Sequence, residues 1–366
     1  MKIPHDRVTV KVRTPARELS PWLVFRVKAP AARHGLLAER PVFSSGWTIR
    51  QGVSVFMKLT HAMPRGIILA LLAATFACSS APYTASKFSV VSEKDDIGRS
   101  VQLPAEVDRV VSLAPSITEI VFAAGAGEKL VGDTTYCNYP PEAQAIEKVG
   151  DTQTPNIERI IALKPQLVLV STASQLETFL GVLDQQGIGV YVVDVKGLDD
   201  IAASIRKIGK ILGSIQAANA SANDLETRIS NVRRQMAVPD EQRPRVFLQI
   251  SKEPLFTIGR SSFLTDLIRI AGGESVTLNI DSAYPKLSKE TAVALDPQII
   301  VLSESEDNKE PNDAFKSSRA MKNGRVLSIN ADIISRPGPR LVDALEKISA
   351  FIAQDKPVSD RNELSK

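Results

Sequence analysis

Short apolar runs alternate with helical patterns along most of the chain. The runs Arg109-Val-Val-Ser-Leu, Leu167-Val-Leu-Val and Val190-Tyr-Val-Val are nearly continuous in apolar side chains, which is typical of strands buried on both faces of a parallel sheet. A helical stretch from Ser116 to Ala124 follows the first run. Strands and helices that alternate at this spacing predict an α/β doubly wound sheet.

The middle of the chain has a different pattern, with one helical stretch free of proline from about Leu198 to Met236. Apolar residues recur there near the helical period, at Ile201, Ile205, Ile208 and Leu212. Pro239 and Pro244 end the stretch, and a second α/β series runs from Arg245 to a terminal helix near Arg340 to Ala353. We therefore predict two doubly wound α/β lobes, joined by one long backbone helix, with a ligand cleft between the lobes.

This pattern divides the chain into segments. We expect an N-terminal lobe at 108–197, a linking helix at 198–238 and a C-terminal lobe at 244–355. A spacer and lead-in at 79–107 precedes the lobes, and a tail at 356–366 follows them.

The two lobes contain an internal repeat. The segment from Glu158 to Ser171 aligns without gaps on the segment from Glu290 to Ser303, at a constant offset of 132 residues, with Glu, Ala, Leu, Pro, Gln and Ser identical. Any helix followed by a proline and a buried strand would share the proline and the aliphatic positions. Such a unit has no need of a glutamate at the start of its helix. The matched positions of Glu158 and Glu290 therefore point to a role beyond the local fold.

An export signal is expected inside the chain. The apolar run from Gly66 to Ala77 has 12 residues, which suits a signal peptide and is shorter than the roughly 20 residues that span a bilayer. With a start at Met57 or Met63, residues 57–78 form a signal peptide that ends in a lipobox-like Cys78. Acylation of Cys78 would anchor an exported protein to a bacterial envelope membrane, whereas ordinary cleavage after Ala77 would leave it soluble in the periplasm. Residues 1–56 are then expected to be a disordered upstream extension from an over-called start codon.

Charge and composition exclude several classes of function. Residues 1–78 hold 12 Lys and Arg against 3 Asp and Glu, and the other 288 residues hold 33 against 38. The mildly acidic remainder gives no basic stripe, so we expect no nucleic-acid partner. All three histidines, His5, His34 and His61, lie in the first segment. This placement argues against histidine-based catalysis or a metal site in the lobes.

Several motifs resemble one known family, the helical-backbone substrate-binding proteins of ABC importers, whose members take up vitamin B12, haem and ferric siderophores. The resemblance covers roughly Arg109 to Ala353. It is carried by Ala114-Pro-Ser-Ile-Thr-Glu, Tyr136-Cys-Asn-Tyr-Pro-Pro-Glu, Asn156-Ile-Glu-Arg-Ile, Arg245-Val-Phe-Leu-Gln and Pro337-Gly-Pro-Arg. It implies a monomeric binding protein that captures a corrinoid and delivers it to a permease dimer with its ATPase subunits, without a cofactor or chemistry of its own.

The resemblance also implies site residues. Ligand contacts fall on aromatic and polar positions, namely Ser116, Tyr136, Phe256, Tyr284, Asp332 and Arg336. Aromatic side chains suit the broad faces of a corrin ring, and polar ones suit its amide rim. Permease docking falls on Glu158 and Glu290, whose carboxylates would engage arginines on the permease. The alternative for each glutamate is a stabilising charge at a helix N-terminus.

Other cargoes and other functions stay open. Haem is an alternative, since Tyr136 would be an iron ligand, and a ferric siderophore is another, since Arg336 and Arg340 would pair with an anionic chelate. Glu119, Asp133 and Asp151 are the carboxylates that an enzyme would use, and an envelope scaffold lipoprotein would bind no small molecule. Cys137 is interpreted as a small packing residue, with a pocket thiol as the alternative.

Overall fold

The computed structural model describes residues 90–172 and 180–354. The upstream extension, the signal peptide with Cys78 and the tail at 356–366 lie outside the described residues. Among those described, no helix is both long and apolar enough to cross a membrane.

The N-terminal lobe is built on a four-stranded parallel sheet in the order β4–β3–β5–β6. An antiparallel hairpin of β1 (Val90–Lys94) and β2 (Ser100–Pro104) precedes it. The strands of the sheet are β3 (Val110–Ser112), β4 (Leu130–Gly132), β5 (Leu167–Ser171) and β6 (Gly189–Val193), and the helices between them are α2 (Pro115–Ala123), α3 (Ile157–Ala162) and α4 (Leu180–Gln185). The side chains from Leu167 to Val170 are fully buried, as a strand covered on both faces requires.

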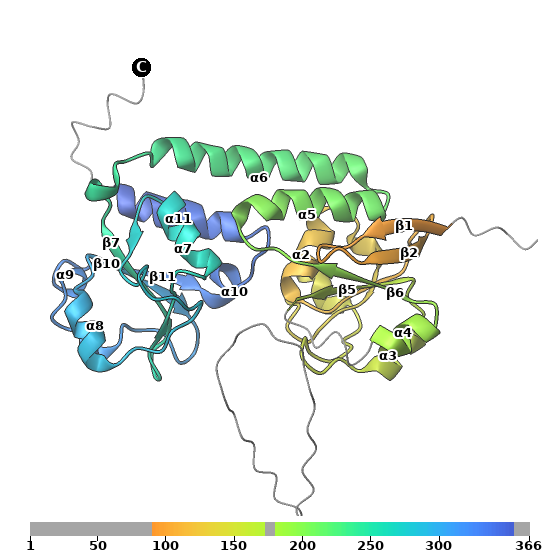
Figure 1. Ribbon diagram of the computed structural model, residues 1–366, viewed down its shortest axis with the longest axis horizontal. Coiled ribbons are helices and arrows are strands. Elements are labelled where there is room, and N and C mark those ends of the chain that lie inside the picture. The colour runs from red at the N-terminus through yellow and green to blue at the C-terminus, as the bar shows by residue number, and fades with distance from the viewer. Residues whose placement is uncertain (1–89, 173–179, 355–366) are drawn as a thin grey trace, which may run out of the picture. The chain divides into compact units, whose positions relative to one another are not determined.

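The predicted long helix between the lobes is confirmed, but the segment 198–238 holds two helices and not one, so its predicted extent is wrong. They are α5 (Leu198–Ile211) and α6 (Ile215–Gln235), and α6 runs above both lobes (Figure 1). The chain turns between them at Gly213, whose φ of 74° favours glycine. The Ser214 N–H donates to the Gly209 carbonyl oxygen at 2.8 Å, which is a bond typical of glycine-terminated helices.

The C-terminal lobe holds a five-stranded sheet in the order β11–β10–β7–β8, with β9 paired to β7. Strands β7, β10 and β11 are parallel, whereas β8 runs antiparallel to β7. The strands are β7 (Arg245–Ser251), β8 (Phe256–Thr257), β9 (Glu274–Ser275), β10 (Ile299–Glu304) and β11 (Val326–Asn330), and the helices are α7 (Phe263–Ile270), α8 (Lys289–Leu295), α9 (Arg319–Lys322), α10 (Ala331–Ile334) and α11 (Leu341–Ala353). Two lobes with parallel sheets confirm the predicted α/β class.

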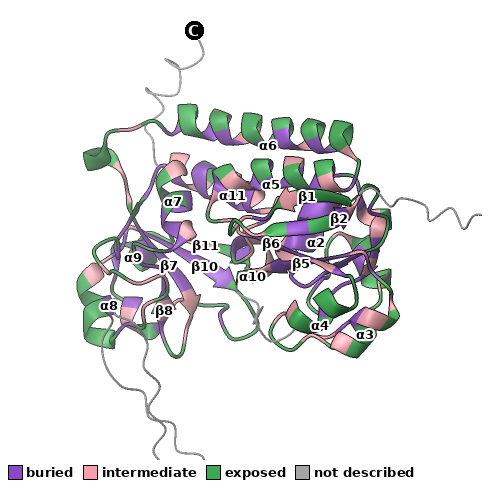
Figure 2. Cartoon of the chain, turned by 45° about the vertical axis from the view of Figure 1, so that its right-hand side comes forward, coloured by how far each residue is buried: buried purple, intermediate pink, exposed green. Residues whose placement is uncertain are grey.

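One hydrophobic core is shared by both lobes. It includes Ile117 of α2, Leu225 and Ile229 of α6, and Val246 and Leu345 of the second lobe. Each lobe also has a separate core on the other face of its sheet. Figure 2 shows the buried strands enclosed by helices whose outer faces are exposed. The lobes are therefore joined by packing along α6 as well as by the chain.

The two copies of the internal repeat share the same helix N-cap and the same positive-φ turn. Asn156 and Ser288 accept hydrogen bonds from the third residue of α3 and α8 at 3.0 and 3.1 Å. Lys164 and Asp296, again 132 residues apart, are the two non-glycine residues with positive φ in the described ranges, at 49° and 37°. Equal caps and equal turns place Glu158 and Glu290 at the same second position of their helices.

Candidate functional site

The two lobes meet at a cluster of charged side chains. Arg340, which precedes α11, donates from Nε and Nη2 to the two carboxylate oxygens of Glu119 in α2, at 3.0 and 2.6 Å. Glu119 is only 3% exposed, and Arg336 lies 3.6 Å from its Oε1. Because two guanidinium groups surround this carboxylate, the buried charge is compensated. The contact joins α2 of the first lobe to the segment before α11 of the second.

A second layer of contacts lies beside the first. Arg336 donates to Asp332 Oδ1 at 2.5 Å, to Asn138 Oδ1 at 2.9 Å and to the Tyr136 carbonyl oxygen at 3.2 Å. Asn138 Nδ2 donates to Asp332 Oδ2 at 2.7 Å. We call Glu119, Asn138, Asp332, Arg336 and Arg340 the interlobe clasp. Arg336 and Arg340 are both neutralised within it, which leaves no spare positive charge for an anionic chelate.

Two of the predicted aromatic residues lie on exposed segments. Tyr136 is 60% exposed and Tyr284 is 45% exposed, one on each lobe. Phe256 is half-buried and forms a β-bridge with Lys286, two residues after Tyr284 in the chain. The structure thus brings Phe256 and Tyr284 onto adjacent segments, and it joins Tyr136 to Asp332 and Arg336 through the clasp.

Ser116 lies at the start of α2, where the second lobe approaches closely. A β-carbon at Gly338 would lie 3.4 Å from the Ser116 Cα, so the chain passes over the N-terminus of α2 at a residue without a side chain. Backbone N–H groups at a helix start favour polar or negative partners.

A buried polar cluster supports the loop that carries Tyr136. Lys148 Nζ donates to Asp133 Oδ1 at 2.7 Å, to the Ala143 carbonyl oxygen at 2.8 Å and to the Cys137 carbonyl oxygen at 3.1 Å. Asp133 is fully buried, and its Oδ2 has no hydrogen-bond partner. Burial raises the pKa of this carboxyl to about 6, although Lys148 acts in the opposite direction.

Cys137 belongs to the same cluster. It is buried, and Thr118 Oγ1 donates to its Sγ at 3.2 Å. Burial also raises the pKa of the thiol, which disfavours the reactive thiolate. These properties agree with its interpretation as a packing residue.

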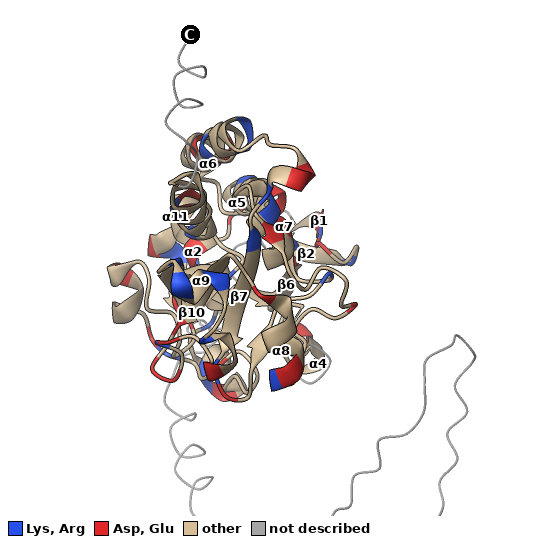
Figure 3. Cartoon of the chain, turned by 90° about the vertical axis from the view of Figure 1, so that its left-hand side faces the viewer, with Lys and Arg blue, Asp and Glu red and all other residues tan. Residues whose placement is uncertain are grey.

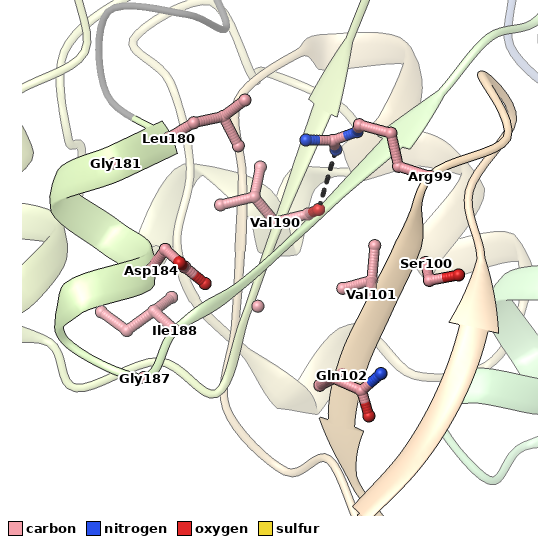
Figure 4. Close-up of a pocket in the computed structure, with 11 residues that line it drawn as sticks. Arg99, Ser100, Val101, Gln102, Leu180, Gly181, Asp184, Gly187, Ile188 and Val190 are labelled. Atoms are coloured by element: carbon pink, nitrogen blue, oxygen red, sulfur yellow. Dashed lines mark hydrogen bonds between the residues drawn. The ribbon is translucent and has the colours of Figure 1, made fainter.

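One cavity lies away from the interlobe clasp and another adjoins it at Glu119 and Arg340. The first, of about 440 Å³, is lined by residues of β2, α4 and β6, and there Arg99 donates to the Val190 carbonyl oxygen at 3.0 Å (Figure 4). The second, of about 470 Å³, lies against α6 and is lined by Leu225, Arg228 and Arg340. The structure shows no group of three metal-ligating side chains within the described ranges.

The two repeat glutamates differ from the other identical residues of the repeat. Gln166 and Gln298 accept hydrogen bonds from the backbone N–H of Arg109 and Arg245 at 3.0 and 2.8 Å. Glu158 is exposed, and its side chain has no hydrogen bond or ion pair with the other described residues. Glu290 is also exposed, and its pKa lies below the usual value because its own backbone N–H and the Ser288 hydroxyl hydrogen-bond its carboxylate.

Helices α3 and α8 both lie on the side of the lobes away from α6 (Figure 1). Acidic and basic residues are interspersed over the chain, and they adjoin at the start of α8 (Figure 3). Two α/β lobes bridged by a helix, with exposed aromatic residues on each lobe, are the architecture of a ligand-capturing protein rather than of a scaffold.

Comparison with known proteins agrees with this class. The sequence matches the family described as "Periplasmic binding protein" over residues 110–333. The vitamin B12-binding protein of Vibrio cholerae is 34% identical over 251 residues, covering 68% of this chain and 90% of the relative. An uncharacterised ABC transporter substrate-binding lipoprotein of Bacillus subtilis, YvrC, is 30% identical over 268 residues, covering 71% and 85%.

Solved structures give the same result. The periplasmic vitamin B12-binding protein BtuF of Vibrio cholerae superposes with a TM-score of 0.60 at 32% identity, covering 68% of this chain and 99% of that one. A periplasmic haem-binding protein from Pseudomonas aeruginosa gives a TM-score of 0.61 at 26% identity, covering 69% and 95%. This chain belongs to the periplasmic binding protein family. It is a substrate-binding protein of an ABC importer, in a non-catalytic group whose named members bind vitamin B12 or haem.

The contacts of the interlobe clasp are not predictable from the sequence. Asn138 stands inside a motif with no sign of its partner, and neither Glu119 nor Arg340 indicates the other. Their partners lie 194 and 221 residues away along the chain, and a single sequence carries no signal for such pairs.

Proposed function

We propose that this protein captures a corrinoid of the vitamin B12 type and delivers it to the permease of its importer. The observation that carries the proposal is the pair of exposed tyrosines, Tyr136 and Tyr284, one on each lobe, with the Asp332–Arg336 pair hydrogen-bonded to the loop of Tyr136. A large ring with apolar faces and a polar rim needs this combination. The vitamin B12-binding relatives support the same cargo.

In this proposal the six predicted residues divide by chemistry. Tyr136, Phe256 and Tyr284 contact the faces of the ring, and Asp332 and Arg336 bind its polar rim. Ser116 offers its backbone at the start of α2. The cleft between the lobes receives the ligand, with 108–197 and 244–355 as its two walls.

Titration with cyanocobalamin tests the cargo. We expect one ligand bound per protein, no turnover, and a stabilisation of about 2.7 kcal/mol at a hundredfold excess over Kd. Tyr136→Ala should weaken binding by about tenfold or more, because an aromatic contact contributes about 1 kcal/mol beyond its buried area. Binding of haemin or a ferric siderophore in place of cyanocobalamin would contradict the proposal.

Haem is the second candidate, favoured by one observation. The phenol of Tyr136 is exposed, and tyrosine is a known haem-iron ligand. If haem is the cargo, Tyr136→Phe should abolish the absorption band of the iron–phenolate bond. Cyanocobalamin should then not compete with haem for the protein. The same substitution should have little effect on corrinoid binding, since it keeps the ring.

The permease partner is proposed to contact Glu158 and Glu290. Both are exposed at the same position of equivalent helices, and Glu158 has no partner among the described residues. Replacing both by Gln should abolish transport in cells and leave ligand affinity unchanged, with a slightly lower unfolding midpoint because the Glu290 carboxylate accepts hydrogen bonds at its helix start. Changing the exposed Glu274 and Glu304 to Gln provides a matched control. Loss of ligand affinity in the double variant would argue against a docking role.

We further propose export with acylation at Cys78, as the lipoprotein relative suggests. Mass spectrometry of the native protein should find a diacylglyceryl group on Cys78 at the mature N-terminus. Recovery of any peptide from residues 1–56 would contradict the proposed start.

A further inference from the structure

The cavity of about 470 Å³ beside α6, which we call the α6 cavity, is lined by side chains of both lobes. Its apolar wall comes from the end of α2, from α6 and from two prolines, namely Phe122, Ala123, Leu225, Pro140 and Pro339. None of the six residues assigned to the cargo is among the described residues that line it. A cavity of this size with an apolar wall falls within the range of small-molecule sites.

Both guanidinium groups that line the α6 cavity are neutralised by carboxylates. Arg340 donates to the two oxygens of Glu119 at 3.0 and 2.6 Å. Arg228 donates to the two oxygens of Glu346 at 2.9 and 2.7 Å, and to Asp343 Oδ1 at 2.6 Å. One guanidinium thus faces two carboxylates, and among the described residues that line the cavity no cation is left for an anionic ligand.

Glu142 adds a negative charge to the lining. It is exposed, and its side chain has no hydrogen bond or ion pair with the other described residues. Tyr139, which is 42% exposed, adds an aromatic ring whose centre lies 4.1 Å from the Arg340 guanidinium carbon. A carboxylate without a partner, beside apolar and aromatic side chains, suits a ligand that carries a positive charge on an apolar body.

The balance of charge distinguishes between classes of ligand. An anion would find both arginines engaged and would meet the surplus carboxylate at Arg228 with a like charge. A neutral apolar molecule would fill the apolar wall and leave Glu142 without a partner. An organic cation satisfies both parts of the lining.

We infer that the α6 cavity is a second binding site, for a small organic cation such as an amine on an aromatic or aliphatic body. The site goes beyond the proposed capture of a cargo and does not depend on which cargo is bound. Because side chains of both lobes line the cavity, its occupant contacts both lobes at once. A ligand that binds the folded protein alone also stabilises it against unfolding.

Phenethylamine is the probe for this site, with 2-phenylethanol as its neutral counterpart and 3-phenylpropionate as its anionic counterpart. We expect phenethylamine to bind with a Kd on the order of millimolar, to raise the unfolding midpoint, and to bind more weakly as the ionic strength rises. The alcohol should bind more weakly than the amine, and the carboxylate should bind most weakly. Equal or tighter binding of 3-phenylpropionate would overturn the inference, as would no binding of phenethylamine well above the expected Kd.

The variant Glu142→Gln tests the charge, with Glu106→Gln as a matched control. Glu106 is also exposed and its side chain also has no partner among the described residues, but it does not line the cavity. Glu142→Gln should weaken phenethylamine binding about threefold, as loss of an exposed ion pair does, and should leave 2-phenylethanol binding unchanged. Glu106→Gln should change neither. Equal effects of the two substitutions would assign the preference to the overall charge of the protein and overturn the site.

The variant Ala123→Leu tests the location. Its larger side chain narrows the cavity at the apolar wall, so phenethylamine and 2-phenylethanol should both bind at least about tenfold more weakly. Circular dichroism checks that the variant is folded, and Glu142→Gln remains the test if it is not. Unchanged binding to a folded Ala123→Leu would overturn the location.

Competition with cyanocobalamin separates this site from the cargo cleft. Phenethylamine should remain bound at saturating cyanocobalamin. Displacement by cyanocobalamin would place the amine in the cargo cleft, which would overturn the second site and leave the corrinoid proposal standing. If cyanocobalamin does not bind, the corrinoid proposal falls, and the charge preference and the two variants still decide the amine site.

Discussion

The two lobes share a repeat but support their loops with different chemistry. In the N-terminal lobe, the Tyr136 loop rests on an ion pair between the partly exposed Lys148 and the buried Asp133, one carboxylate oxygen of which has no hydrogen-bond partner among the described residues. In the C-terminal lobe, the segment after β10 rests on the neutral amides of Gln249, Asn308 and Asn312, of which Gln249 and Asn308 bond each other at 2.7 Å.

The difference lies in how each network is satisfied. Asn308 Nδ2 donates to the carbonyl oxygens of Gln249, Ile250 and Ser303 at 3.2, 3.2 and 2.8 Å, so the neutral network is saturated and carries no charge. A buried carboxylate carries a desolvation cost that changes with protonation. We therefore expect the support of the Tyr136 loop to respond to pH through Asp133, and the network of Gln249 and Asn308 not to respond.

The strongest test of this contrast removes the charged support. Lys148→Met should lower the free energy of unfolding by about 3 kcal/mol, because it leaves Asp133 buried without its partner. Urea denaturation at pH 7 measures the loss. The control is Lys196→Met, whose exposed pair with Asp194 should contribute less than about 1 kcal/mol. Equal losses in the two variants would contradict the structural role of Lys148.

Removing Asn308 from the neutral network should lower the free energy of unfolding slightly less than Lys148→Met does. Asn308→Ala deletes the donor of three hydrogen bonds and leaves buried carbonyl oxygens unpaired, which should cost about 2–3 kcal/mol. The loss should be the same at pH 5 and pH 8, since no charged group is involved. Asn323→Ala, at an exposed position, is the control. A pH-dependent loss would remove the contrast between the lobes.

The pH dependence of the free energy of unfolding provides a further test, because Asp133 is the buried charged group of the N-terminal support. Its folded pKa, about 6, lies above the ordinary value of 3.8, so the folded state favours the protonated form. Stability from this group is complete below pH 3.8 and is lost as the pH rises through 6. We expect an effect on the order of 2 kcal/mol between those limits. Asp133→Asn should flatten the profile, and an unchanged profile would show that another group titrates.

The smallest expected effect compares the repeat directly. Gln166 accepts from the backbone N–H groups of Asp108 and Arg109 and donates to the Glu106 carbonyl oxygen, whereas the Gln298 side chain has one hydrogen bond to the described residues, from the Arg245 N–H. Gln166→Ala should therefore cost about 1–2 kcal/mol and Gln298→Ala about 1 kcal/mol. Thermal unfolding of the two variants measures the difference, and a larger loss for Gln298→Ala would reverse the expectation.

The lobes and the class of fold could be predicted because buried parallel strands leave continuous apolar runs. The division of α5 from α6 could not, because the helical spacing continues after the break at Ala218, Ala222 and Leu225. The only local signal was Gly213, and a glycine inside a helical pattern does not by itself end a helix.

The candidate site could be predicted in part. Residues identified through motifs, such as Tyr136 and Arg336, lie at the junction of the lobes, but their partners depend on folding. Whether Asp332 faces a ligand or Asn138 is decided by a contact between residues 194 positions apart. Nothing in the local pattern specifies that distance.

The hydrophobic core that both lobes share along α6 determines which measurements would detect a separation of the lobes at the clasp. The lobes are joined by apolar packing on that side and by the hydrogen bonds of the clasp on the other. A rotation that separates the clasp while keeping the shared core would break ion pairs and expose little apolar surface. Such an opening would hardly change the heat capacity or the response to urea, which follow exposed area. Rising ionic strength, which weakens the exposed part of the clasp, would favour it instead.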